Sequence, residues 1–238
     1  EFPLDLGSKG SCQIGGNLST NAGGIHFIKY NSLRNNTTEL DVILPNGQKL
    51  SLNESDSNSS TDIGCYGLKN LFIGSEGTLG VITRAKIKTF EKMAFTQNAL
   101  VSVSKYEDVV NIFQKAKVAL KSSLSAIEFF DSHCMSFVTS NLNIENPFGS
   151  HTNTDKGSSS SNTGTQNFFV LIEVASNSDN SDLIQDFFEQ IDDLCLDIVL
   201  SSNETQFKQL WSLRERISEA SIKNGYCFKY DVSLPHSK

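Results

Sequence analysis

The sequence predicts an α+β fold in two parts, and three observations lead to this prediction. Residues before Phe90 combine glycine-rich turns with short strands. Residues after Phe90 alternate strand-like and helix-like patterns in short units, which is typical of helices packed on one side of a mostly antiparallel sheet. The 238 residues are enough for one large domain or two modest ones. We therefore expect one part over residues 1–90 and a second over residues 91–238.

The first part contains a hairpin signal and one alternating strand. Residues 39–44 and 48–52 flank the turn Pro45-Asn46-Gly47, a combination that favours a β-hairpin. Residues 81–89 alternate apolar and basic side chains, as expected for a half-buried strand. Its two predicted faces consist of Val81, Thr83, Ala85 and Ile87 on one side and of Arg84, Lys86 and Lys88 on the other.

The second part is expected to alternate strands and helices. Apolar and β-branched runs predict strands at 99–103, 125–130, 168–174, 197–200 and 226–232. Helical periodicity predicts helices at 106–120, 133–140, 183–195 and 205–223. In the last helix, one apolar stripe would dock the helix on its neighbours, formed by Leu210, Leu213, Ile217 and Ala220.

Composition excludes several classes of function. The net charge of −7 and the absence of a Lys/Arg run argue against nucleic acid and anionic membrane surfaces as partners, but small acidic substrates stay compatible. No apolar stretch reaches the roughly 18 residues of a membrane span, and residues 1–10 do not read as a signal peptide. Five cysteines without a CxxC pair predict neither zinc nor disulfides and favour a reducing intracellular compartment.

Two low-complexity stretches and four histidines complete this survey. Residues 53–62 and 150–167 hold too few apolar side chains to offset the entropy of ordering them, so we expect surface insertions. The histidines share no ligand spacing, and we assign no metal to His26, His133, His151 or His236.

Two glycine-rich segments carry the first chemical signal. Residues 10–24 read GSCQIGGNLSTNAGG, and residues 71–83 read LFIGSEGTLGVIT. Glycines let the backbone approach a ligand closely, and backbone N–H groups can face negatively charged oxygens. Neither segment has the spacing of a Rossmann fingerprint or of a Walker A loop. From composition alone, ordinary loops between strands remain an equal alternative.

In this order, the two segments resemble the FAD-binding domain of the flavin-dependent D-2-hydroxy-acid dehydrogenases, which share the vanillyl-alcohol-oxidase-type fold. The resemblance implies the second half of a PCMH-type FAD-binding domain, followed by a ferredoxin-like α/β-sandwich substrate (cap) domain. It also implies FAD as the cofactor. The residues then expected along the flavin are Ser11, Cys12, Gly15, Gly16, Asn17, Thr20, Asn21, Gly23, Gly24, Gly80, Val81 and Ile82.

Residues 211–235, WSLRERISEASIKNGYCFKYDVSLP, look most like the members of this family that oxidise D-2-hydroxyglutarate. By that resemblance, Arg214, Ser218 and Lys229 bind the carboxylates of the substrate. Arg214 and Ser218 are four residues apart and would share a helix face, while Lys229 would follow on a strand. A guanidinium, a hydroxyl and an ammonium suit a dicarboxylate. The alternative is an ordinary solvated helix face.

The resemblance implies that a hydride passes from C2 of a small D-2-hydroxy acid to the flavin. D-lactate or glycolate is an alternative substrate, and a non-catalytic interaction module is an alternative class. The family's pyrophosphate loop is expected before residue 1, and its catalytic base and zinc-like metal ligands after residue 238. We therefore expect no catalytic residue within this stretch, and neither tight FAD binding nor turnover by it alone. The expected location is mitochondrial or cytoplasmic, and the electron acceptor stays open.

Overall fold

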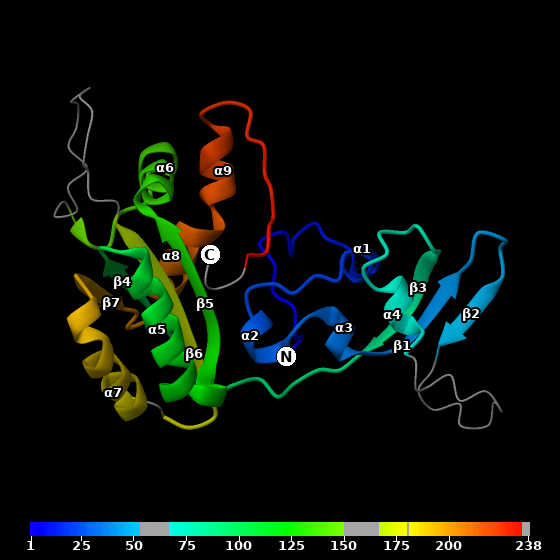
Figure 1. The fold of residues 1–238 in the computed structure, drawn as a ribbon, viewed down its shortest axis with the longest axis horizontal. Helices are drawn as coiled ribbons and strands as arrows, with labels where there is room; N and C mark the ends of the chain where they lie inside the picture. The colour runs from blue at the N-terminus through cyan, green and yellow to red at the C-terminus, as the bar shows by residue number, and fades with distance from the viewer. Residues whose placement is uncertain (53–66, 150–166, 180, 235–238) are drawn as a thin grey trace. The chain divides into compact units, whose positions relative to one another are not determined.

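A computed structural model describes residues 1–52, 67–149, 167–179 and 181–234. It contains two β-sheets, with strand orders β2-β1-β3 and β5-β6-β4-β7, together with helices, which confirms the predicted α+β class (Figure 1). The chain groups into two compact units. One consists of residues 1–96, 114–127 and 172–190, and the other of residues 97–113, 128–171 and 191–238. Apart from Asn167, the two low-complexity stretches lie outside the described residues.

The three-stranded sheet is built on the predicted hairpin. Strand β1 (Thr37–Ile43) pairs antiparallel with β2 (Lys49–Leu52) on one side and with β3 (Val81–Ile87) on the other. Gly47 has a φ of +83°, a left-handed conformation that glycine adopts without strain, and its N–H donates to the carbonyl of Leu44 at 2.9 Å. The turn prediction is confirmed.

Strand β3 differs from its predicted alternation. Asp41 pairs with Arg84 but Val42 pairs with Ile82, so Thr83 is an extra residue, as in a β-bulge. The bulge shifts the side-chain phase by one position. As a result, Ile82 packs against the core while Val81 is 65% exposed. The predicted apolar face was therefore wrong at Val81 and Thr83 and right at Ala85 and Ile87, which also pack against the core.

Four short helices lie in the first part, where only turns and strands are predicted. They are α1 (Ile14–Ser19), α2 (Phe27–Tyr30), α3 (Leu33–Asn36) and α4 (Lys69–Phe72). Glycine disfavours a helix by about 1 kcal/mol, which conceals α1 in the sequence. Burial of apolar side chains overrides this preference. The core cluster consists of Leu18, Leu33, Leu40, Val42, Phe72 and Ile73.

The four-stranded sheet contains four of the five strands predicted for the second part. They are β4 (Phe95–Val103), β5 (Leu124–Asp131), β6 (Phe168–Ser176) and β7 (Asp197–Leu200). Strands β4 and β7 are antiparallel, with Ala99 opposite Leu200. Strand β6 is buried along most of its length, as its apolar sequence FFVLIEV predicts.

The helices of the second part begin close to their predicted positions. They are α5 (Tyr106–Ala119), α6 (Ser132–Leu142), α7 (Ser181–Ile191), α8 (Glu204–Glu215) and α9 (Ile217–Ile222), and 3₁₀ turns cover Lys121–Ser123 and Asp192–Leu194. The side chains of Asp131 and Asn203 cap the N-termini of α6 and α8. Helix α6 packs against α8 and α9. Within the described ranges, no helix is both long and apolar enough to cross a membrane.

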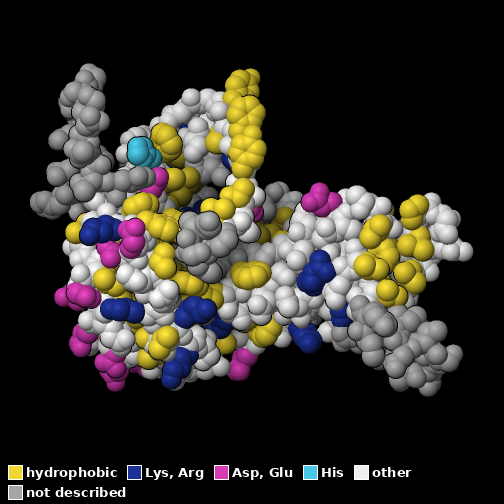
Figure 2. Space-filling view, in the orientation of Figure 1, with side chains coloured by type: hydrophobic (Ala, Val, Ile, Leu, Met, Phe, Trp, Pro, Cys, Tyr) yellow, Lys and Arg dark blue, Asp and Glu magenta, His cyan; other side chains and the backbone are white. Residues whose placement is uncertain are grey.

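Two predictions near the C-terminus need correction. The single helix expected over 205–223 is interrupted at Arg216, whose ψ of 7° leaves the helical region, so α8 and α9 are separate helices. The strand expected over 226–232 is wrong, because residues 226–234 are irregular and exposed. A strand needs a hydrogen-bonded neighbour, and none of the described strands pairs with this segment. Figure 2 shows its hydrophobic side chains as an exposed row.

Candidate functional site

The two glycine-rich segments lie side by side, although 46 residues separate them in the sequence. The N–H of Gly74 donates to the carbonyl of Leu18 at 3.0 Å, and the N–H of Glu76 donates to that of Ser19 at 2.9 Å. A Cβ added to Gly15 would lie 3.6 Å from the carbonyl oxygen of Ile82. This adjacency brings both halves of the expected cofactor-binding set together. Their contact with a flavin stays a prediction.

Arg34 on α3 forms hydrogen bonds with both segments. Its guanidinium donates to the carbonyl of Asn70 at 2.6 Å and to that of Ile73 at 2.5 Å, while its backbone N–H donates to Oδ1 of Asn21 at 3.0 Å. Asn21 also has a positive φ of 53°. The hydrogen bond to Oδ1 of Asn21 therefore stabilises the loop in this conformation. No local pattern around Arg34 indicated this role.

Other polar side chains of the first segment also bond within it. The Thr20 hydroxyl donates to the carbonyl of Gly16 at 3.1 Å, and Nδ2 of Asn17 lies 3.4 Å from Sγ of Cys12. The side chain of Ser11 donates to Ser8 at 3.4 Å. These hydrogen bonds hold the shape of the loop.

The glycines of the expected set fall into two kinds. A Cβ on Gly80 would come within 2.7 Å of both the carbonyl of Ile43 and a methyl group of Val42, so close packing on β1 requires glycine there. Gly23 is packed against the Phe27 ring, and Gly24, with a φ of +72°, against the carbonyl of Asp5. By contrast, a Cβ on Gly16 would meet no atom within 4 Å.

Both joined segments also carry exposed apolar side chains. They are Ile14 in the first segment and Leu79 and Val81 in the second. Hydrophobic side chains also gather over α4, β1 and β3 (Figure 2). An exposed apolar surface of this kind beside an open glycine backbone is suited to bury a ligand. The residues present are therefore compatible with the isoalloxazine of FAD.

Arg214, the first expected substrate residue, lies in α8 and forms an ion pair with β5. Its Nη2 lies 2.8 Å from Oε2 of Glu128, and the two side chains are 38% and 25% exposed. The buried residues Trp211 and Leu213 anchor the helix beside it. Nε of Arg214 is buried and has no hydrogen-bond partner among the described residues. The guanidinium is thus paired through one nitrogen, while 38% of the side chain as a whole is exposed.

Asp131 and Cys134 lie close to this arginine. Burial, followed by hydrogen bonding to Asp131, raises the pKa of the Cys134 thiol to about 11, and the charge of Arg214 opposes that rise. Oδ1 of Asp131 accepts the N–H of Cys134 at 2.9 Å as the cap of α6. At neutral pH the thiol is therefore protonated and is neither a nucleophile nor a second anion.

The structure shows no contact that brings the three expected substrate residues together. Ser218 lies exposed on α9, beyond the interruption at Arg216, so the helix face that it was expected to share with Arg214 is broken. Lys229 lies in the exposed irregular segment and makes no hydrogen bond or ion pair with any described residue. A common role of Arg214, Ser218 and Lys229 stays a prediction.

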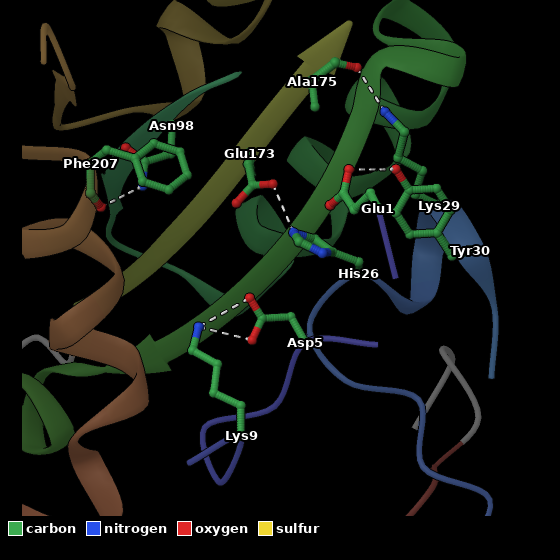
Figure 3. A network of polar contacts seen from close by, with 10 residues as sticks. All are labelled: Glu1, Asp5, Lys9, His26, Lys29, Tyr30, Asn98, Glu173, Ala175 and Phe207. Atoms are coloured by element: carbon green, nitrogen blue, oxygen red, sulfur yellow. Dashed lines mark hydrogen bonds and ion pairs between the residues drawn. The ribbon is translucent and has the colours of Figure 1, made fainter. Parts of the chain in front are cut away.

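A buried polar network that the sequence analysis missed joins α2 to β6 (Figure 3). Nε2 of His26, just before α2, lies 2.9 Å from Oε1 of Glu173, and both residues are buried. The Lys29 ammonium donates to the carbonyl of Ala175 at 2.7 Å, and the Tyr30 hydroxyl to Oε2 of Glu1 at 3.3 Å. One signal was available, because a glutamate inside the buried run FFVLIEV requires a partner.

The charges around His26 raise its pKa above the ordinary value. Burial lowers the pKa, but the hydrogen bond to Glu173 and the negative charges of Glu173, Asp5 and Glu1 together outweigh burial. Nδ1 of His26 is buried without a hydrogen-bond partner among the described residues. Burial also raises the pKa of the nearby Tyr30 to about 12, and Glu1 adds to this effect. The network thus favours the protonated imidazole of His26 more than water does.

The described residues contain no group of His, Cys, Asp and Glu side chains that could hold a metal ion. Cys12, Cys134, Cys195 and Cys227 form no disulfide within the described residues, and Cys65 lies outside the described ranges. Of the histidines, His151 and His236 also lie outside them.

Two models of protein families match the chain. The model of FAD linked oxidases, C-terminal domain, matches residues 92–238, and the model of an FAD binding domain matches residues 1–53. The chain is 38% identical over its whole length to the mitochondrial D-2-hydroxyglutarate dehydrogenase of Danio rerio, and 40% identical over 98% of its length to that of Bos taurus. It spans 42% and 40% of the lengths of these two relatives.

Among solved structures, an alkyldihydroxyacetonephosphate synthase is similar with a TM-score of 0.58. The match covers 94% of this chain and 41% of that one, at 16% sequence identity. This likeness concerns the fold alone.

Proposed function

The chain belongs to the family of FAD-linked oxidases. We propose that it is part of an FAD-dependent dehydrogenase that oxidises small D-2-hydroxy acids. Residues 1–90 contribute the flavin-facing loops, and residues 91–238 contribute the substrate domain. One observation carries the proposal: backbone hydrogen bonds join the two glycine-rich segments, and at Gly16 an added Cβ would meet no atom within 4 Å. D-2-hydroxyglutarate is the proposed substrate, supported by the identity of 38–40% to dehydrogenases of that acid.

FAD, when bound, accepts the hydride that leaves C2 of the hydroxy acid. The backbone of residues 11–24 offers N–H groups, while Ile14 and Val81 offer exposed apolar surface that would exclude water from the ring. The side chains of Asn21 and Thr20 keep the loop in shape through their internal hydrogen bonds. In this proposal, Gly80 acts indirectly, because its packing on β1 places Val81 and Ile82.

Arg214 binds one carboxylate of the substrate, and Ser218 and Lys229 complete the acid-binding set. A dicarboxylate supplies two anionic ends for two cations, whereas a monocarboxylate such as D-lactate needs only one. The partial exposure of the Arg214 side chain, 38%, supports this role. Since the named relatives are mitochondrial enzymes, we place the protein in the mitochondrion as well.

The test is a pair of glycine substitutions in the full-length protein. Gly16→Leu adds a side chain where no atom lies within 4 Å, at a helical position that favours leucine over glycine. We expect this variant to fold normally and to lose the visible absorbance of bound flavin. Gly7→Leu is the matched control, because a Cβ there also meets no atom within 4 Å and Gly7 is outside the expected cofactor set. Full flavin content in Gly16→Leu would contradict the proposal.

A further inference from the structure

We propose that Glu128 is a positioning residue that holds the Arg214 guanidinium in the orientation that receives a substrate carboxylate. This inference rests on the proposed role of Arg214 in binding the hydroxy acid. Its basis is the 2.8 Å ion pair between the two side chains, together with the way in which the other acids near Arg214 are engaged.

Glu128 restricts the motion of the flexible Arg214 side chain through their ion pair. It belongs to β5, which lies in the four-stranded sheet, and only 25% of its side chain is exposed. A free arginine side chain loses rotamer entropy when it is fixed. An ion pair that already restricts Arg214 removes part of that cost from substrate binding.

The ion pair leaves donors of Arg214 for a ligand. A guanidinium carries five N–H donors, and Glu128 engages one nitrogen, Nη2. Among the described residues, no other hydrogen bond or ion pair is made by this side chain, and 38% of it is exposed. A carboxylate from solvent can therefore form charge-assisted hydrogen bonds with guanidinium N–H groups that Glu128 does not engage.

Asp131, which is near Arg214 through Cys134, and Glu219 on the following helix have contacts of their own. Asp131 accepts the N–H of Cys134 as the cap of α6. Glu219 pairs with Arg216 through two hydrogen bonds of 2.8 and 2.9 Å. Glu128 is therefore the carboxylate whose removal is expected to free Arg214 without uncapping a helix.

The experiment measures steady-state kinetics of the full-length holoenzyme with D-2-hydroxyglutarate. Glu128→Ala is expected to raise KM roughly tenfold and to leave kcat within about twofold, because positioning of a binding group acts on ground state and transition state alike. Glu128→Gln keeps the shape and a hydrogen-bond acceptor, so its KM should rise less. Glu219→Ala is the control, an exposed acid on α9 whose loss should not change KM.

A double-mutant cycle separates positioning from a merely structural role. Arg214→Ala should raise KM by about ten- to a hundredfold, and Glu128→Ala added to it should raise KM no further, because the residue that it positions is gone. Additive effects in the double variant would overturn the inference. A lower KM in Glu128→Ala would also overturn it, since Glu128 would then compete with substrate for Arg214.

The same variants distinguish this inference from the proposed function. Unchanged kinetics in Arg214→Ala would contradict the proposed role of Arg214 itself. A raised KM in Arg214→Ala with unchanged kinetics in Glu128→Ala would contradict only the positioning role. If Glu128→Ala does not fold, Glu128→Leu decides, because it fills the space of the side chain and removes both acceptor oxygens, and an unchanged KM in that variant overturns the inference.

Discussion

Glu173 on β6 and Glu128 on β5 each pair with a basic side chain, and the two pairs differ in how much of them is exposed to solvent. In the pair of Glu173 with His26 the side chains are 4% and 11% exposed, whereas in the pair of Glu128 with Arg214 they are 25% and 38% exposed. The distances are nearly equal, 2.9 and 2.8 Å. The distance within a pair therefore does not distinguish a structural ion pair from a side chain that can bind a ligand. Exposure to solvent distinguishes them, because a ligand can reach only the pair of Glu128 with Arg214.

The largest expected effect on stability comes from breaking the buried pair. His26→Ala leaves the Glu173 carboxylate buried without its partner, and removal of one member of a buried pair typically costs 3–5 kcal/mol. Because Glu173 makes a further polar contact, we expect a loss of roughly 3 kcal/mol in the free energy of unfolding. Urea denaturation monitored by circular dichroism measures it.

The reverse substitution provides the control for that prediction. Glu173→Ala leaves a histidine that can lose its proton and become neutral, so it should destabilise the protein less than His26→Ala does. Equal losses in the two variants would show that the buried charge of Glu173 is not what makes the pair important.

The dependence of stability on pH sharpens the comparison further. The folded state raises the pKa of His26 above 6.5, so the imidazole contributes stability that is complete below about pH 6.5 and is lost as pH rises through the folded pKa. The groups that set this pKa are Glu173, Asp5 and Glu1. The stability difference between the parent protein and His26→Gln should therefore shrink with rising pH. A difference that is constant or grows over this range would contradict the assignment.

The smallest expected effect is the stability change at the half-exposed pair. Glu128→Ala should lower the free energy of unfolding by about 1 kcal/mol or less, because solvent screens a pair with this exposure. Thermal melts of Glu128→Ala and of the control Glu219→Ala should nearly coincide. A loss as large as that of His26→Ala would make Glu128 a structural residue and would remove the contrast between the two pairs.

Local signals in the sequence predicted most elements of the fold. Pro45-Asn46-Gly47 fixes a hairpin through its own backbone preferences, and the apolar run of β6 predicts a buried strand. The errors occurred where a neighbour decides the outcome. Thr83 shifts the register of β3 against β1, and residues 226–232 have strand-like alternation but no described strand beside them. Pairing of this kind cannot be read from one segment.

For the candidate site, the sequence indicated residues but not their partners. The glycine segments were predicted to meet, and backbone hydrogen bonds join them. Arg214 was singled out, yet Glu128 was not, although a glutamate within the apolar run of β5 is itself a signal. His26 and Glu173 are 147 residues apart, so nothing local links them.

The contrast between Gly80 and Gly16 has a consequence for natural and engineered variation. At Gly80, any side chain would collide with the backbone of Ile43, so substitutions there should reduce the amount of folded protein in a cell. At Gly16, space is open, so substitutions should leave abundance unchanged and remove activity. A variant library scored once for abundance and once for activity should therefore place these two positions in different classes.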